Sequence, residues 1–264
     1  MQEWLNKRCR LYWYDQYANN NQETAFSKYD PDRIVNEHLS VSSDIVAVYA
    51  ANQIGISYYP SKIWPQHPGL KGRDYFGEVS SRLRENGIKV IAYINYLDSK
   101  HPEWNILPLG SEPLSESPLV SWADQSKQNG RVQDLAGGAW NIPCYNSPHR
   151  DDILAIAEEI ASTYKPELFH LDMFFHAGIC VCPYCAPFIK NIISSENITI
   201  DAIHEHWIEY INWRNERSSS LIAELSRIVR KYGCAAAHNA FAPLYISPMS
   251  GLSEQWLDHL DVFL

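Results

Sequence analysis

A chain of 264 residues with 45% hydrophobic and 20% charged side chains is long enough to bury a large core, which excludes disordered, fibrous and very small disulfide-dependent classes. A net charge of −9 without a Lys/Arg cluster argues against nucleic acid and anionic membranes as partners. No apolar run approaches the roughly 20 residues that span a bilayer, and the first residues lack a signal-peptide pattern, so we expect a cytoplasmic location.

Short β-rich segments alternate with helical ones, an order that predicts parallel strands joined by crossover helices. Asp30-Pro31 is a typical helix start and Asn86-Gly87 a typical helix end. The segment 97–145 is rich in Pro, Ser and Gly and lacks periodicity, which is typical of a functional or disordered loop. Helices are predicted at 31–39, 75–85, about 151–164, 187–193 and about 200–232, and strands at 10–16, 44–50, 88–96, 167–174, 234–240 and 260–264.

Six strands separated by helices and long loops favour a TIM (β/α)₈ barrel that is truncated after about strand six, as a single domain over 1–264. The alternative is an open, doubly wound sheet of six strands. No Gly-rich phosphate-binding fingerprint follows the first strand, so the nucleotide-binding version of that alternative lacks its signature. In the barrel, the carboxyl ends of the strands build the active site.

Polar residues gather at these strand ends. In the strand 167–174, His170 and Asp172 alternate with apolar residues, so both are expected to face the barrel axis, either as functional groups or as a buried ion pair. The other strands end in similar residues, a pattern suited to a polyhydroxylated ligand. The predicted substrate-binding residues are Asp15, Asn52, Gln53, Tyr93, Asn95, Trp104, His170, His238 and Asn239. Loop aromatics expected to stack on sugar rings are Trp64, Trp104, Trp122, Trp140 and Tyr145.

Three cysteines, Cys180, Cys182 and Cys185, fall within one short loop. With Cys144 from the preceding loop they predict a closed, structural Zn²⁺ site of four thiolates, and no organic cofactor is expected. The alternative is a set of free thiols in a cysteine-rich loop. Cys9 and Cys234 lie before strands, at the opposite end of the sheet, and are expected to be small buried residues.

Several short motifs resemble known families. Tyr58-Tyr59-Pro60-Ser61-Lys62, His67-Pro68-Gly69-Leu70 and His101-Pro102-Glu103-Trp104 resemble the hypothetical glycosyl hydrolase 6 family, which is similar to α-L-fucosidases of glycoside hydrolase families 29 and 151. Cys144-Tyr145-Asn146-Ser147-Pro148 and the Cys180 to Cys185 motif resemble the zinc site of family 42 β-galactosidases. These resemblances imply a TIM barrel and a retaining glycosidase.

The resemblance also implies roles for single residues. Asp172 matches the nucleophile position of family 29, whereas family 42 enzymes hold their acid/base Glu there; an aspartate and the fucosidase-like first half favour the nucleophile. The second catalytic carboxyl group stays open between Glu254, Glu103 and a residue beyond Leu264. The sugar-holding His-His-Asp-Gly run of family 29 is replaced by Asn52-Gln53-Ile54-Gly55, which weakens the expectation of fucose but keeps sugar binding through amides.

The first functional hypothesis is therefore a retaining glycosidase, most like an α-L-fucosidase, acting on terminal sugars of oligosaccharides or glycoconjugates. The alternatives are a β-galactosidase-like enzyme, a carbohydrate-binding barrel without catalysis, and a zinc-dependent hydrolase. The expected partners are a carbohydrate substrate and further copies of the protein, in a homo-oligomer formed through C-terminal domains that this chain lacks. Strand edges left uncovered in a truncated barrel favour poor stability or association.

Overall fold

The structure is a computed structural model, and it describes residues 4, 9–13, 15–18, 23–52, 55–95, 132–133, 139–140, 143–172, 174, 179–238 and 254–263. The helices are α1 (Pro31–Ser40), α2 (Tyr75–Glu85), α4 (His149–Tyr164), α5 (Ala186–Ile193), α6 (Ile200–Glu205) and α7 (Trp207–Lys231), with 3-10 turns η2 (Pro68–Leu70) and η5 (Glu254–Asp258). The strands are β1 (Leu11–Tyr12), β2 (Ile45–Tyr49), β3 (Lys89–Asn95), β4 (Val132–Gln133), β5 (Ala139–Trp140), β6 (Leu168–Asp172), β7 (Ala235–His238) and β8 (Val262–Phe263).

Local sequence signals account for where several helices begin. The Asp30 side chain accepts hydrogen bonds from the backbone N–H groups of Asp32 and Arg33 at the start of α1, and Thr199 caps α6 through Ala202 in the same way. The single helix predicted at about 200–232 is wrong in one respect. The chain leaves helical geometry at His206, which ends α6 and precedes α7.

The six strands β1, β2, β3, β6, β7 and β8 form one sheet in that order, and every neighbouring pair is parallel. A doubly wound sheet requires the strand order to reverse at one point, and the described sheet has no reversal. Right-handed crossovers between strands that follow one another in sequence order place the connecting helices on one face of the sheet. The strand order therefore supports winding in one direction, as in barrel folds, over the doubly wound alternative.

The two faces of the sheet differ in what they contact. One face carries Val46, Val48, Ala92 and Phe169, which belong to the main core with apolar residues of the helices. On the other face a second cluster combines Ile45, Ala47, Ile91, Leu168, Ala235 and Ala237 with Trp13. Because side chains alternate along a strand, the second face continues into Tyr49, Tyr93, Asn95, His170 and Asp172 at the carboxyl ends.

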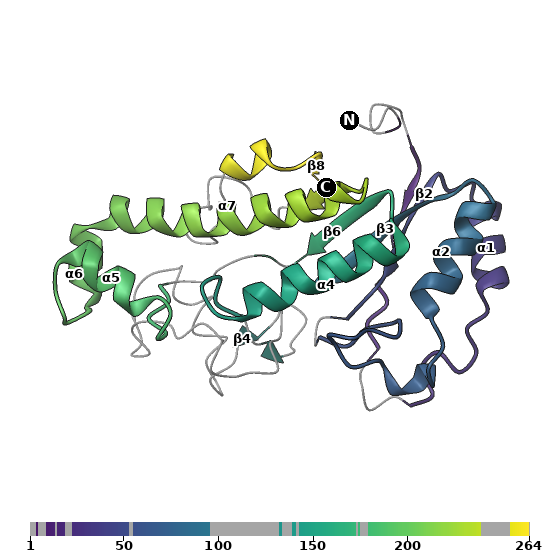
Figure 1. Ribbon diagram of the computed structural model, residues 1–264, viewed down its shortest axis with the longest axis horizontal. Helices are drawn as coiled ribbons and strands as arrows, with labels where there is room; N and C mark the ends of the chain where they lie inside the picture. Colours follow the sequence, from purple (N-terminus) through teal and green to yellow (C-terminus); the bar gives the residue numbers. More distant parts are fainter. Residues whose placement is uncertain are drawn as a thin grey trace.

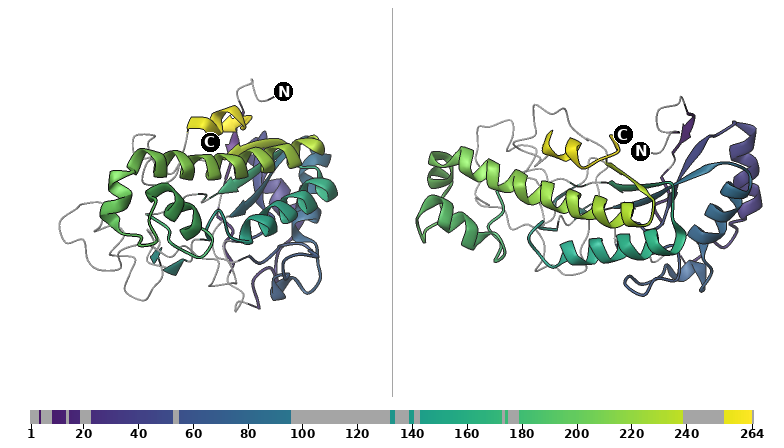
Figure 2. Two further views of the ribbon diagram at one scale, coloured as in Figure 1. Left: turned by 60° about the vertical axis from the view of Figure 1, so that its left-hand side comes forward. Right: turned by 45° about the horizontal axis from the view of Figure 1, so that its top comes forward.

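Helices flank the sheet in neighbouring pairs. Figure 1 shows α4 beside α7 and α1 beside α2, and both pairs are in contact. The short helices α5 and α6 lie near the first turns of α7, away from the sheet, in Figure 1 and in the right-hand view of Figure 2. They enclose a separate apolar cluster with the four cysteines and Tyr210. Among the described residues, no helix combines the length and apolar character needed to cross a membrane.

Candidate functional site

Asp172 lies at the end of β6, and a network from neighbouring strands holds it. Its side chain is buried, with 5% of its surface exposed. The hydroxyl of Tyr93 on β3 donates a hydrogen bond to Asp172 Oδ2, and the Asn95 side-chain amide donates to the Tyr93 hydroxyl over 3.1 Å. The register pairs Tyr93 with His170 and Asn95 with Asp172, so the backbone ladder itself aligns these side chains.

Two further tyrosines extend this network. The Tyr17 and Tyr93 hydroxyl oxygens are 2.9 Å apart, and the ring of Tyr49 stacks on that of Tyr93 with 3.7 Å between centroids. Tyr49 donates its hydroxyl proton to Asp15 Oδ1 over 2.7 Å. The structure thus brings the predicted residues Asp15, Tyr93 and Asp172 together through phenols.

Burial keeps these phenols protonated. Burial and the nearby Asp172 carboxylate raise the pKa of Tyr93 well above its ordinary value, and burial together with the hydrogen bond to Asp15 raises the pKa of Tyr49. Burial also raises the pKa of Tyr17. Tyr93 and Tyr49 therefore donate to Asp172 and Asp15 as protonated phenols, while the Tyr17 hydroxyl hydrogen-bonds that of Tyr93.

His170 lies two residues before Asp172 and is fully buried. Its ring packs edge-on against Trp13, with 4.8 Å between centroids, and stacks at 5.9 Å from Tyr93. Neither ring nitrogen has a hydrogen-bond partner among the described residues, so the alternative of a His170–Asp172 ion pair is not formed there. Burial, with a smaller contribution from His238, holds the pKa of His170 well below its usual range, and the ring is neutral.

His238, predicted to bind substrate, lies among apolar groups. Its Nδ1 contacts the backbone oxygen of Leu171, and its ring lies 5.9 Å from the Phe174 ring and 5.0 Å from the Trp256 ring. Its register partner is Leu171, on the face of β6 that packs into the main core. Burial lowers its pKa to about 4.

The side chain of Asn52 is engaged in folding a loop. Its amide donates to the backbone oxygen of Ala18 over 2.9 Å, and its oxygen accepts from the backbone N–H of Ile56 over 3.0 Å.

The predicted residues Gln53, Trp104 and Asn239 and the candidate acid Glu103 lie outside the described residues, and Glu254 is the first residue of η5. Of the loop aromatics, Trp64 and Tyr145 are buried, Trp140 lies in β5, and Trp104 and Trp122 fall outside the described part.

Tyr17 and Tyr49 are site residues that sequence reasoning missed. Tyr49 shares the alternation of Ile45 and Ala47 along β2, and this pattern was sufficient to find it. Tyr17 follows a strand of two residues, Leu11–Tyr12, which gives no alternation to extend.

A wide-open surface cavity of about 770 Å³ adjoins this network at Asp15 and Tyr17. Its lining includes Asp15 and Tyr17 together with the aromatic rings of Phe26, Tyr29 and Tyr75. A volume of this size falls within the range of small-molecule sites, and a polar edge with aromatic walls suits a sugar.

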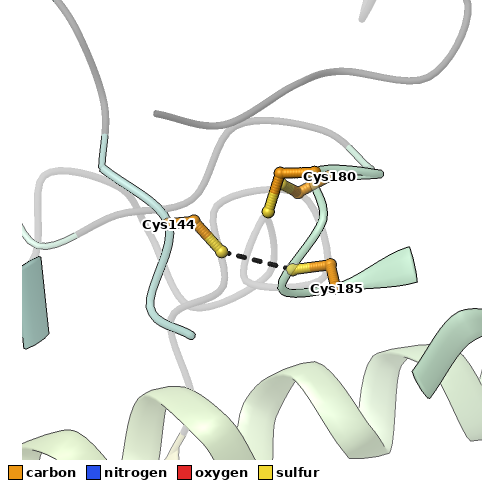
Figure 3. A group of neighbouring side chains, drawn as sticks. Cys144, Cys180 and Cys185 are labelled. Carbon is orange, nitrogen blue, oxygen red and sulfur yellow. Dashed lines mark hydrogen bonds between the residues drawn. The ribbon is translucent and has the colours of Figure 1, made fainter. Parts of the chain in front are cut away.

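The four predicted metal ligands, Cys144, Cys180, Cys182 and Cys185, lie together. Their sulfur atoms are all within 4.8 Å of one another, and each side chain has at most 1% of its surface exposed. Figure 3 shows Cys144 and Cys185, whose sulfurs are 3.2 Å apart, with Cys180 beside them. Tetrahedral Zn–S bonds of about 2.3 Å separate sulfurs by about 3.8 Å, so the cluster fits one such ion.

The surroundings of the cysteines suit thiolates. The Asn146 backbone N–H points to Cys144 Sγ and its side-chain amide to Cys185 Sγ, each at 3.4 Å. Hydrogen bonding to Cys180 raises the pKa of Cys144, whereas hydrogen bonding to Cys144 lowers that of Cys182. The negative charge of one thiolate therefore disfavours ionisation of the neighbouring thiol, and a bound cation would balance the charge of the thiolates.

The other two cysteines differ in exposure. Cys234 is buried as expected, whereas Cys9 is exposed, so its expected burial is wrong.

Two of the motifs on which the resemblance rests, residues 58–62 and 67–70, lie in the loop after β2. Tyr59 and Ser61 donate hydroxyl protons to Glu159 on α4 over 2.7 and 2.6 Å, and the Lys62 backbone N–H donates to the same carboxylate. Tyr58 donates to the backbone oxygen of Gln16 over 2.6 Å. These residues position the loop between β1 and α4.

No protein-family model and no curated protein sequence matches the chain. Among solved structures, the chain is similar to α-L-fucosidase isoenzyme 2 from Paenibacillus thiaminolyticus, with a TM-score of 0.68 and 16% identity over 89% of this chain and 33% of that one. It is also similar to the glycoside hydrolase domain of PgaB (BpsB) from Bordetella bronchiseptica, with a TM-score of 0.65 and 15% identity over 97% of this chain and 73% of that one. The chain thus spans about a third of the fucosidase, and the likeness shows a fold shared with glycoside hydrolase structures.

Proposed function

We propose that the protein is a retaining glycoside hydrolase, most like an α-L-fucosidase, in which Asp172 is the nucleophile. The observation that carries this proposal is the position of Asp172 at the carboxyl end of a central parallel strand, where Tyr93 hydrogen-bonds its side chain. The fold shared with the fucosidase and with the PgaB domain supports the same reaction class. The six strands are then part of a (β/α)₈ barrel, with residues 1–264 in one domain.

In the proposed reaction, the Asp172 carboxylate attacks the anomeric carbon and forms a glycosyl ester, which water then hydrolyses. Tyr93 donates to one carboxylate oxygen and so orients the other towards the sugar, while Asn95 fixes Tyr93. A second carboxyl group must protonate the leaving oxygen and later activate water. The neutral ring of His170, beside Tyr93 on the same face, is proposed to hydrogen-bond a sugar hydroxyl.

Aryl α-L-fucosides and aryl β-galactosides test the proposal and its galactosidase alternative directly. The wild-type protein is expected to hydrolyse one of the two. Replacing Asp172 by Asn should lower kcat by at least about 10⁴-fold, because a covalent step is lost. Asp151→Asn, an exposed carboxylate on α4, is the matched control and should keep wild-type rates.

Full activity of Asp172→Asn would refute the nucleophile assignment. Binding of a sugar without turnover by the wild-type protein would favour the carbohydrate-binding alternative.

We further propose that the four cysteines hold one structural Zn²⁺. Four thiolates leave no open position on the ion, which supports a structural role and opposes the zinc-dependent hydrolase. Bound zinc would tie the loop before α4 to the loop before α5. Metal analysis should find one zinc per chain, with loss of the metal and a lower melting temperature in Cys144→Ser. The exposed Cys9→Ser is the control, and unchanged zinc content in Cys144→Ser would contradict the site.

A further inference from the structure

Three tyrosine hydroxyls lie close together near Asp172, and two of them hydrogen-bond different carboxyl groups. Tyr93 donates to Asp172, and Tyr49, stacked on Tyr93 with an angle of 11° between the rings, donates to Asp15. The Tyr17 hydroxyl hydrogen-bonds that of Tyr93, and its ring packs edge-on against Tyr49 at 5.3 Å. We call Tyr17, Tyr49 and Tyr93 the phenol cluster.

The stacked rings act as a rigid spacer between the two carboxyl groups. Tyr49 and Tyr93 are fully buried on adjacent strands, and the register pairs them directly. Their hydroxyls therefore have little freedom to move relative to one another. The two rings are 3.7 Å apart, and the retaining mechanism requires this spacer to hold the two catalytic carboxyl groups about 5 to 5.5 Å from one another.

The two carboxyl groups differ in their access to solvent. Asp172 is buried, whereas Asp15 is exposed and lines the aromatic cavity together with Tyr17. The Tyr49 hydroxyl donates a hydrogen bond to Asp15 Oδ1, and no described residue donates a hydrogen bond to Oδ2. One oxygen of Asp15 is thus fixed by Tyr49, and the exposed side chain borders the cavity.

We propose that Asp15 is the second catalytic carboxyl group, held opposite Asp172 by the phenol cluster; this inference rests on the proposed glycosidase function. Within the part of the chain that the structure describes, Asp15 is the one carboxylate besides Asp172 that hydrogen-bonds this cluster. The aromatic cavity beside it then receives the leaving group.

The proposed reaction has two steps, and Asp15 transfers a proton in each. The Asp15 carboxylic acid gives its proton to the glycosidic oxygen as the bond between that oxygen and the anomeric carbon breaks, and Asp172 bonds to the carbon. The Asp15 carboxylate then takes a proton from a water molecule. The water oxygen bonds to the anomeric carbon, and the ester bond to Asp172 breaks, which restores both groups.

Leaving-group dependence distinguishes a proton donor from other roles. For Asp15→Asn, kcat/KM should fall by about 10² to 10⁴-fold on a methyl or 4-methylphenyl glycoside, which needs protonation, and by less than about 10-fold on a 2,4-dinitrophenyl glycoside, which does not. Added azide should restore turnover of the dinitrophenyl glycoside and yield a glycosyl azide. Tyr49→Phe should show the same pattern to a smaller degree, with Asp151→Asn as the control and a melting curve to confirm folding.

Two results overturn the inference. Either kcat/KM of Asp15→Asn falls equally on glycosides of both classes of leaving group, or it equals the wild-type value on both. If the wild-type protein is active and requires Asp172 while Asp15→Asn behaves as wild type, only this inference fails. If the wild-type protein hydrolyses no glycoside, the proposed function fails with it.

Discussion

His170 and His238 are buried, neutral histidines one strand apart, with 6.3 Å between their ring centroids. Burial lowers the pKa of both, to about 4 for His238. In the unfolded chain these histidines are protonated as the pH falls below about 6.5, whereas in the folded chain His238 is protonated only as the pH falls to about 4. Between these values protons favour the unfolded state, so stability is greatest above pH 6.5 and falls as the pH drops.

We predict that the free energy of unfolding decreases from pH 7 to pH 5 by at most ~1.4 kcal/mol per pH unit for each of these histidines. His238→Gln should flatten this dependence, whereas the exposed His204→Gln should not. Urea unfolding at pH 7, 6 and 5 measures both slopes. Identical slopes for wild type and His238→Gln would contradict a neutral, buried His238.

At the residue scale, alternation along a strand was the informative signal. It placed His170 and Asp172 on one face of β6 and Tyr93 and Asn95 on one face of β3, and the register confirms that these pairs are aligned. Which hydroxyl reaches which carboxylate depends on side-chain packing between strands, which spacing does not encode. The contacts of His238 with Phe174 and Trp256 depend on the same kind of packing.

At the element scale, the loop between β2 and α2 depends on Gly69. A Cβ added there would lie 2.3 Å from the backbone oxygen of Ala25, closer than any tolerated contact. Gly69→Ala must therefore displace the segment around Ala25 and Phe26, which lines the aromatic cavity. His67, whose ring nitrogen accepts the Gly69 N–H over 3.1 Å, fixes the same turn.

We expect Gly69→Ala to destabilise the protein by about 3 kcal/mol and to weaken ligand binding at the cavity. Gly72→Ala is the control, because Gly72 has a positive φ of 86° but open space around it, so its cost is the backbone strain of about 1 to 2 kcal/mol. Denaturant unfolding compares the two variants. A Gly69→Ala protein as stable as wild type would show that the close approach to Ala25 is absent.

The predicted elements agree with the structure where local signals are strong. α2 has the predicted bounds, since Asp74 caps its start and Asn86-Gly87 its end. The break at His206 was missed because the apolar spacing continues across it. The approach of the Cys144 loop to the loop from Cys180 to Cys185 was predicted, because these loops follow β3 and β6, which pair in the sheet.

At the scale of the whole molecule, the alternation of strands and helices was sufficient to predict a parallel α/β fold. The strand order then distinguishes winding in one direction from the doubly wound alternative. The solved structures with this fold at a TM-score of 0.68 and 0.65 include a fucosidase and a glycoside hydrolase domain. Which sugar is bound depends on loop side chains at the carboxyl ends of the strands, which strand periodicity does not specify.

The proposal that Asp172 forms a covalent bond with a sugar is central to this account. The most direct test is the intact mass of the protein after incubation with a 2-deoxy-2-fluoro glycosyl fluoride of the sugar it hydrolyses, followed by peptide mapping. We predict the addition of one fluorosugar per chain, on Asp172, and none on Asp172→Asn. An adduct on another residue, or no adduct on a protein that hydrolyses the corresponding aryl glycoside, would contradict the account.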